Sequence, residues 1–169
     1  LSLHDALPNL TQSGEYYFLS RPRRFGKSLF LSTLKAAYQG KKELFQDLYL
    51  EENWDWHTAH PVVHISFGSG VVRNTQELQT TFDEILYDHS RQYDIEYAKK
   101  SLKGRFAELV HSLYEQYDRA VVILVDEYDK PILDNIEDTN TAVAVREELK
   151  NYYSVIKDSD PYIEFVFIT

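Results

Sequence analysis

The chain has 169 residues, a length typical of one globular domain with a sizeable core. Its net charge is −9, and the excess of acidic residues lies entirely within residues 61–169, which excludes a basic face suited to duplex nucleic acid. Without cysteine it has neither disulfides nor thiolate metal sites. No apolar run approaches the ~18 residues of a membrane span, and no secretory signal is visible, so we expect a cytoplasmic protein.

The first predicted strand, residues 16–19, leads into the run Arg21-Pro22-Arg23-Arg24-Phe25-Gly26-Lys27-Ser28. An amphipathic helix follows, with Phe30, Leu34, Ala37 and Tyr38 on one face. Strand, tight loop, Gly-Lys-Ser and helix are the context of a phosphate-binding P-loop, in which a helix N-terminus and a lysine meet an anion. Because Arg21 occupies the position of the first glycine in GxxxxGK[ST], this segment alone also fits an ordinary exposed helix start.

The chain between residues 41 and 117 alternates predicted helices with a second strand. We expect a short amphipathic helix over 41–50, a loop over 51–60, a strand over 61–67, and two helices that begin near residues 75 and 102. The loop carries Trp54 and Trp56, for which packing is favoured over a nucleobase platform. Asn74 and Glu77 have the spacing of a helix-capping pair.

The second chemical motif follows the predicted strand Val121–Val125. Five consecutive apolar residues indicate a strand buried on both faces, so Asp126 and Glu127 must lie at its exposed carboxyl end. This pattern is typical of a Walker B strand, whose aspartate holds Mg²⁺ and whose glutamate polarises the attacking water. An acidic turn after a buried strand is the plain alternative. Both motifs, in this order in one domain, favour a nucleotide site.

The remaining elements complete an alternating α/β pattern. A loop through residues 129–134, a helix from about Thr141 and a final strand over 162–168 are predicted. Asp129 fits either a further metal-shell acid or the cap of a turn. Arg23 and Arg24 could brace phosphates or pair with the acidic surface. The whole order predicts a three-layer α/β/α fold with a mainly parallel sheet, as in P-loop NTPases.

Two segments, residues 16–29 and Leu124-Val125-Asp126-Glu127-Tyr128-Asp129-Lys130-Pro131-Ile132-Leu133, resemble signatures of the predicted AAA-ATPase-like family. Residues 40–45 and 61–65 also match, so the resemblance covers about residues 15–169. In that largely bacterial family an arginine stands at the position of Arg21. The resemblance implies ATP rather than GTP, and a PD-(D/E)XK nuclease-like domain that often follows the ATPase.

The extra strand between the two motifs and the glutamate after Asp126 resemble the AAA/ASCE class of ATPases. In that class a polar residue at the end of the next strand, here Thr169, senses the γ-phosphate. We therefore expect Lys27 and Glu127 to act in catalysis and Ser28 and Asp126 to hold Mg²⁺. The residues expected to contact ATP are Arg23, Arg24, Phe25, Gly26, Lys27, Ser28, Leu29 and Thr169.

Residues 1–8 resemble the translation of a sequencing adaptor, and we expect a non-native scar there, followed by a partial domain over 9–169. In the resembled class the P-loop strand lies between the sensor strand and a fifth strand, so a chain truncated after the sensor strand leaves it at an edge. The expected function is ATP hydrolysis that drives a conformational change in an attached domain or partner. The alternatives are a nucleotide-dependent switch with little hydrolysis and the ATPase part of a nuclease-linked DNA-processing protein.

Overall fold

The computed structural model describes residues 16–20 and 26–169, which form an α/β fold on four parallel strands. The strands are β1 (Tyr16–Phe18), β2 (Val62–Ser66), β3 (Val121–Asp126) and β4 (Ile163–Ile168). Their spatial order is β1-β4-β3-β2, so within the described sheet β1 lies at one edge and pairs with β4. This confirms the predicted neighbour of the P-loop strand and its place at an edge.

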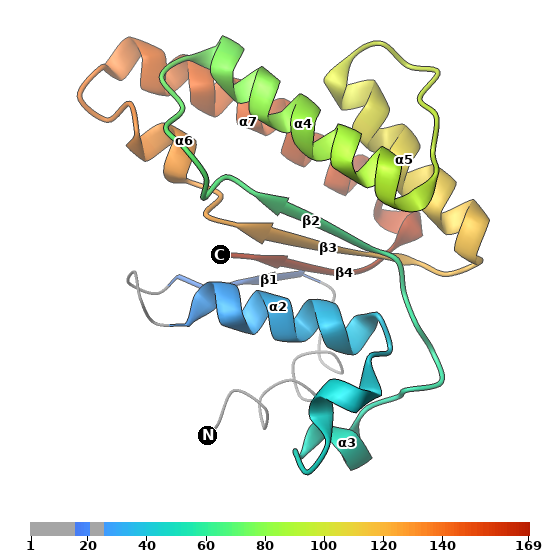
Figure 1. The fold of residues 1–169 in the computed structure, drawn as a ribbon. Coiled ribbons are helices and arrows are strands. Elements are labelled where there is room, and N and C mark those ends of the chain that lie inside the picture. The colour runs from blue at the N-terminus through green and yellow to red at the C-terminus, as the bar shows by residue number, and fades with distance from the viewer. Residues whose placement is uncertain (1–15, 21–25) are drawn as a thin grey trace.

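Helices cover both faces of the sheet (Figure 1). One face is covered by α2 (Lys27–Tyr38), and the other by α4 (Thr75–Tyr93), α5 (Leu102–Tyr117) and α7 (Thr139–Asp158). The short elements are η1 (Lys42–Phe45), α3 (Leu50–Asn53), α6 (Lys130–Leu133) and η2 (Asp160–Tyr162). Figure 1 shows α6 and the beginning of α2 at the carboxyl ends of the strands, and α3 below the other end of α2.

Alternation along β3 divides the apolar side chains between two cores. Val121, Ile123 and Val125 pack with α4, α5 and α7, whereas Val122 and Leu124 pack with α2. All six residues of β3 are buried, as the unbroken apolar run predicts for a central parallel strand. The two cores therefore fix β3 from both sides, and only its carboxyl end is left for polar chemistry.

Side-chain caps define where the long helices begin. Asn74 Oδ1 accepts a hydrogen bond of 2.9 Å from Glu77 N, and Glu77 Oε2 accepts one of 2.7 Å from Arg73 N, which confirms the predicted capping pair. Ser101 and Asp138 cap α5 and α7 in the same way. These caps satisfy amide groups that a helix start otherwise leaves unpaired.

The prediction of one helix over residues 41–50 is wrong. The segment forms the 3₁₀ helix η1 and turns at Asp47 (φ +60°). The helix α3 begins only at Leu50 and runs to Asn53, into the predicted loop over 51–60. Leu44, Leu48 and Tyr49 are exposed, so the segment lacks the continuous buried face that stabilises an amphipathic helix. The predicted loop over 129–134 likewise contains the short helix α6.

Trp54 and Trp56 pack against other aromatic side chains, as the sequence analysis predicted. Trp54 lies edge-on to Tyr38, with ring centroids 5.1 Å apart, and 6.3 Å from Trp56. Trp56 Nε1 donates to the carbonyls of Leu50 and Glu51 at 3.1 and 2.9 Å. Both rings thus extend the α2 core and hold α3 against it.

Candidate active site at the carboxyl ends of the strands

The N-terminus of α2 is built without an acidic or capping side chain. Gly26 precedes the helix with φ +74°, a left-handed conformation that favours glycine, and its carbonyl accepts the first helical bond from Phe30 N at 2.9 Å. Lys27 is half-buried, and Ser28 and Leu29 are exposed on this first turn. The positive end of the helix dipole therefore meets no carboxylate of its own first turn, which suits an external anion.

Asp126 and Glu127 occupy the end of β3 in unusual surroundings. Asp126 is only 6% exposed, yet its Oδ1 has no hydrogen-bond partner within the described part of the chain. Glu127 has φ +53°, a left-handed conformation that costs a non-glycine residue about 1–2 kcal/mol. Strain of this kind clusters at functional sites, where the surrounding structure holds it in place.

The strand register places Asp126 and Thr169 on the same face of the sheet. Leu124 and Phe167 pack with α2, so Asp126 and Thr169, each two residues further along its strand, also face α2. Thr169 N donates to the carbonyl of Val125 at 2.9 Å, which ties the end of β4 to β3. The buried Thr169 Oγ1 has no hydrogen-bond partner among the described residues.

His64 and Ser66 extend this polar face along β2. Ser66 pairs in register with Asp126, and Val62, on the same face of β2, packs in the α2 core. Burial lowers the pKa of His64, the charge of Lys35 lowers it further, and the charge of Asp126 opposes both. Its buried Nε2 also lacks a partner among the described residues.

These unpaired atoms fit a cation and a polyphosphate. A buried polar atom without a partner costs free energy, and native proteins rarely retain one without a functional reason. Carboxylate and hydroxyl oxygens are the ligand types that Mg²⁺ prefers. The Asp126 carboxylate and the Ser28 hydroxyl supply this chemistry on the α2 side of the sheet.

Some predicted site residues cannot be placed. Arg21, Arg23, Arg24 and Phe25 lie outside the described residues. Asp129 occupies the N-cap position of α6, but its side chain makes no capping hydrogen bond there, so its role as cap or metal-shell acid stays open.

The structure adds two features to this edge that the motifs did not indicate. A Cβ atom placed on Gly68 would lie 3.5 Å from Glu127 Cδ, so the glutamate side chain rests against the loop after β2. Lys130 Nζ donates to the carbonyl of Gly70 at 2.6 Å in the same loop. The only sequence signal for these contacts is the place of the loop after β2, because the carboxyl ends of adjacent parallel strands meet at one edge.

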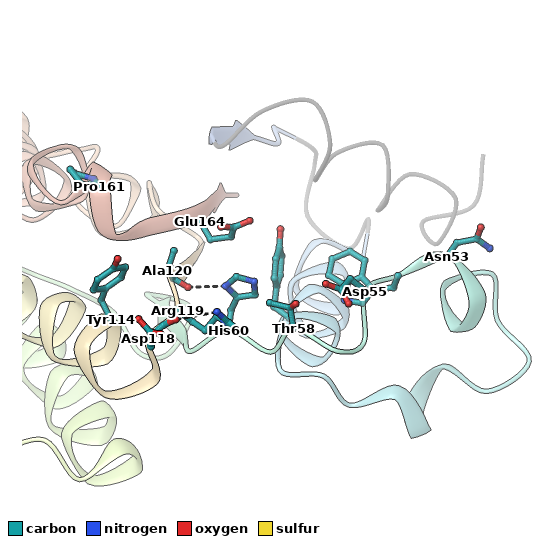
Figure 2. A pocket seen from close by; sticks show the side chains of 12 residues that line it. Asn53, Asp55, Thr58, His60, Tyr114, Asp118, Arg119, Ala120, Pro161 and Glu164 are labelled. Atoms are coloured by element: carbon teal, nitrogen blue, oxygen red, sulfur yellow. Dashed lines mark hydrogen bonds between the residues drawn. The ribbon is translucent and has the colours of Figure 1, made fainter.

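A cavity of about 650 Å³ lies at the opposite, amino end of the strands. Figure 2 shows it between His60, Tyr114 and Glu164, with a hydrogen bond of 2.9 Å between His60 Nδ1 and the Ala120 carbonyl. Its walls come from the ends of α2, α5 and β4 and from the loop after α3. None of the predicted site residues lines it.

A family model described as predicted AAA-ATPase, AAA-ATPase-like, matches residues 6–169. The chain belongs to this family. Family membership associates this AAA-ATPase-like chain with nucleotide binding and with a predicted ATPase activity. Within residues 16–20 and 26–169, no helix is both long and apolar enough to cross a membrane.

This AAA-ATPase-like chain is 45% identical over 160 residues to a protein of Azotobacter chroococcum mcd 1 described as an uncharacterized protein in the vnfD 5' region. The match covers 95% of the chain and 31% of that protein. No solved structure matches the chain.

Proposed function

We propose that this chain binds ATP with Mg²⁺ at the carboxyl edge of the sheet, in a P-loop fold of the AAA/ASCE class, and hydrolyses it. The observation that carries the proposal is the pair of buried, unpaired oxygens, Asp126 Oδ1 and Thr169 Oγ1, on the face that α2 covers. The uncapped start of α2 and its Lys27 provide the complementary positive charge. Family membership supports the choice of a nucleotide as ligand.

Each proposed role follows from position and charge. Lys27 and the amides at the start of α2 bind the β- and γ-phosphates, with Arg23, Arg24, Phe25, Gly26 and Leu29 lining the phosphate chain. Bound between Ser28 and Asp126, Mg²⁺ would neutralise phosphate charge and orient the triphosphate. Thr169 contacts the γ-phosphate from the end of β4.

Glu127 acts as the general base or orients the attacking water. It directly follows Asp126 and is only partly exposed, so its carboxylate is available at the mouth of the site. A base at this position favours hydrolysis over a passive nucleotide switch. We further propose that turnover changes the conformation of an attached domain or partner, of which a C-terminal nuclease-like domain is the candidate that the resemblance implies.

Lys27→Ala tests the binding site in the purified protein. The loss of a charge-assisted contact worth about 1.5–3 kcal/mol should weaken ATP binding by at least tenfold in isothermal titration with Mg²⁺. The matched control is Lys42→Ala, because Lys42 is exposed in η1 beyond the other end of α2. Equal ATP affinity in Lys27→Ala and the parent would contradict the assignment.

A further inference from the structure

The segment after Glu127 carries charged residues that the proposed ATP site does not use. Lys130 is the first residue of α6, and its Nζ donates to Asp134 Oδ2 at 2.7 Å and to the Gly70 carbonyl at 2.6 Å. The side chains of Lys130 and Asp134 are only 13% and 15% exposed. Gly70 precedes Lys130 by 60 residues, so this buried ion pair joins the loop after β2 to the helix after β3.

Two more side-chain contacts hold the same loop. Asp134 Oδ2 accepts a hydrogen bond of 3.0 Å from Val72 N. The buried Asn135 Nδ2 donates to the Val72 carbonyl at 2.6 Å and to the Pro131 carbonyl at 2.9 Å. We call Lys130, Asp134 and Asn135 the loop clamp. Its polar groups are matched to backbone groups of one short segment, residues 70–72, so the clamp fixes that segment in one position.

Gly68, two residues before the clamped segment, lies beside Glu127. Gly68 lies so close to the glutamate that an added Cβ would be 3.5 Å from Cδ and 3.7 Å from Oε1. On the other side, Lys130 N donates to the Glu127 carbonyl at 3.1 Å. The left-handed backbone of Glu127 is thus held between α6 and the loop that α6 clamps.

Stability alone is a weak reason to retain this ion pair. Removing two charges from water costs several kcal/mol, and apolar residues of similar size often stabilise a fold equally well. The ion pair instead holds the loop after β2 in a fixed position beside Glu127, whose backbone is strained. A misplacement of about 1 Å at a reacting group can cost 10²-fold in rate.

We propose that the loop clamp positions the Glu127 carboxylate for hydrolysis, with Lys130 as a positioning residue that acts through Glu127. This inference rests on the proposed ATPase function. It assigns a role to the lysine and the second aspartate that follow the Walker B motif.

The test is a double-mutant cycle between Lys130→Met and Glu127→Gln in the purified protein, measured by steady-state hydrolysis of radiolabelled ATP. Lys130→Met should lower kcat at saturating ATP by about tenfold or more, with the Kd for ATP unchanged within about twofold. In the Glu127→Gln background it should cause no further loss, because the group that it positions is already gone. Lys130→Arg, which retains the charge, should restore most of the rate.

The possible outcomes distinguish a failure of the positioning role of Lys130 from a failure of the proposed ATPase function. If Lys130→Met lowers kcat equally in both backgrounds, or lowers ATP affinity in proportion, its role is only structural and the inference is overturned. If the parent hydrolyses ATP and Lys130→Met retains kcat, the clamp role alone is overturned. A parent whose hydrolysis does not depend on Lys27 overturns the proposed function and the positioning role with it.

A second variant, Asp134→Asn, keeps the test possible if Lys130→Met does not fold. Asp134→Asn keeps an oxygen that can accept from Val72 N and Lys130 Nζ but removes the buried negative charge. If Lys130→Met does not melt cooperatively, Asp134→Asn replaces it in the same cycle. A smaller loss of kcat that disappears in the Glu127→Gln background supports the clamp, and an additive loss overturns it.

Discussion

The two ends of the sheet differ in how their polar groups are satisfied. At the amino ends, Tyr93 Oη donates to the Val62 carbonyl at 2.8 Å and accepts from Val62 N at 3.1 Å, and His60 is bonded to the Ala120 carbonyl. At the carboxyl ends, the buried Asp126 Oδ1 and Thr169 Oγ1 have no partner among the described residues. At the amino ends only the amide oxygen of Gln39, at the end of α2, is buried without a partner among the described residues. The two ends therefore differ in chemistry, because the unpaired oxygens at the carboxyl end belong to a carboxylate and a hydroxyl, which can bind a cation.

The difference shows that cavity size is a poor guide to the site. The 650 Å³ cavity of Figure 2 lies at the amino end, whereas the unpaired oxygens of Asp126 and Thr169 lie at the carboxyl end. In open parallel sheets, ligands bind outside the carboxyl ends of the strands, where helix N-termini also point. The unpaired oxygens of Asp126 and Thr169 support this edge as the site because carboxylate and hydroxyl oxygens are ligand types that Mg²⁺ prefers.

The largest expected effect comes from replacing a glutamate with glutamine at each end of the sheet and comparing the loss of ATP turnover. Glu127→Gln should slow ATP turnover by roughly 10²–10⁴ while ATP stays bound, because the amide cannot accept the proton of the attacking water. Glu164→Gln, an exposed position beside the cavity at the amino end, should leave kcat unchanged. Steady-state phosphate release measures both. Negligible hydrolysis in the parent would favour the nucleotide switch instead.

Asp126→Asn should act in opposite directions on binding and on stability. Loss of the carboxylate should weaken Mg²⁺-dependent ATP binding by about tenfold or more. The free protein should gain on the order of 1 kcal/mol, because the substitution removes the charge of a buried carboxylate whose Oδ1 has no hydrogen-bond partner among the described residues. Asp118→Asn at the amino end is the control, since asparagine tolerates its left-handed backbone (φ +49°). Urea unfolding with and without Mg²⁺-ATP measures both effects, and a destabilised free Asp126→Asn would contradict the comparison.

Tyr93→Phe should show the reverse pattern. Removing the hydroxyl leaves the amide and carbonyl of Val62 without their buried partner and should destabilise the protein by about 1–2 kcal/mol. ATP affinity and kcat of the folded protein should not change. Tyr87→Phe, an exposed tyrosine on the same helix, should have no effect on unfolding. A Tyr93→Phe protein as stable as the parent would show that the amino end is not held by this contact.

The smallest expected effect is a pH dependence from two histidines, the buried His89 and the partly buried His64. Burial lowers the pKa of His64 and of His89 below the ordinary value of 6.5. The unfolded chain therefore binds more protons just below that value, so their contribution to stability is complete above pH 6.5 and is lost as the pH falls toward the lowered pKa values. His89→Gln should flatten the decline of the unfolding free energy below pH 6.5, as urea titrations can measure. His57→Gln, at an exposed position, should leave the slope unchanged.

Local sequence patterns predicted most of the fold. The apolar run of β3, the capping pair at α4 and the periodic faces of α4, α5 and α7 need only neighbours along the chain, and all appear in the structure. The helix over 41–50 failed because Leu44, Leu48 and Tyr49 stay exposed, so the buried Phe45 and Leu50 do not belong to one continuous helical face. Which residues bind ATP stays a prediction, because Arg23, Arg24 and Phe25 lie outside the described residues.

The sequence by itself determined the two motifs, their order and the parallel α/β pattern, since each depends on spacing that is visible along the chain. Only the tertiary structure decided which residues that are far apart in the sequence lie side by side. Strand register places Ser66 beside Asp126, the loop after β2 brings Gly68 against Glu127, and Lys130 reaches back 60 residues to Gly70. Such contacts have no sequence period, because they depend on how the strands are ordered and where their loops end.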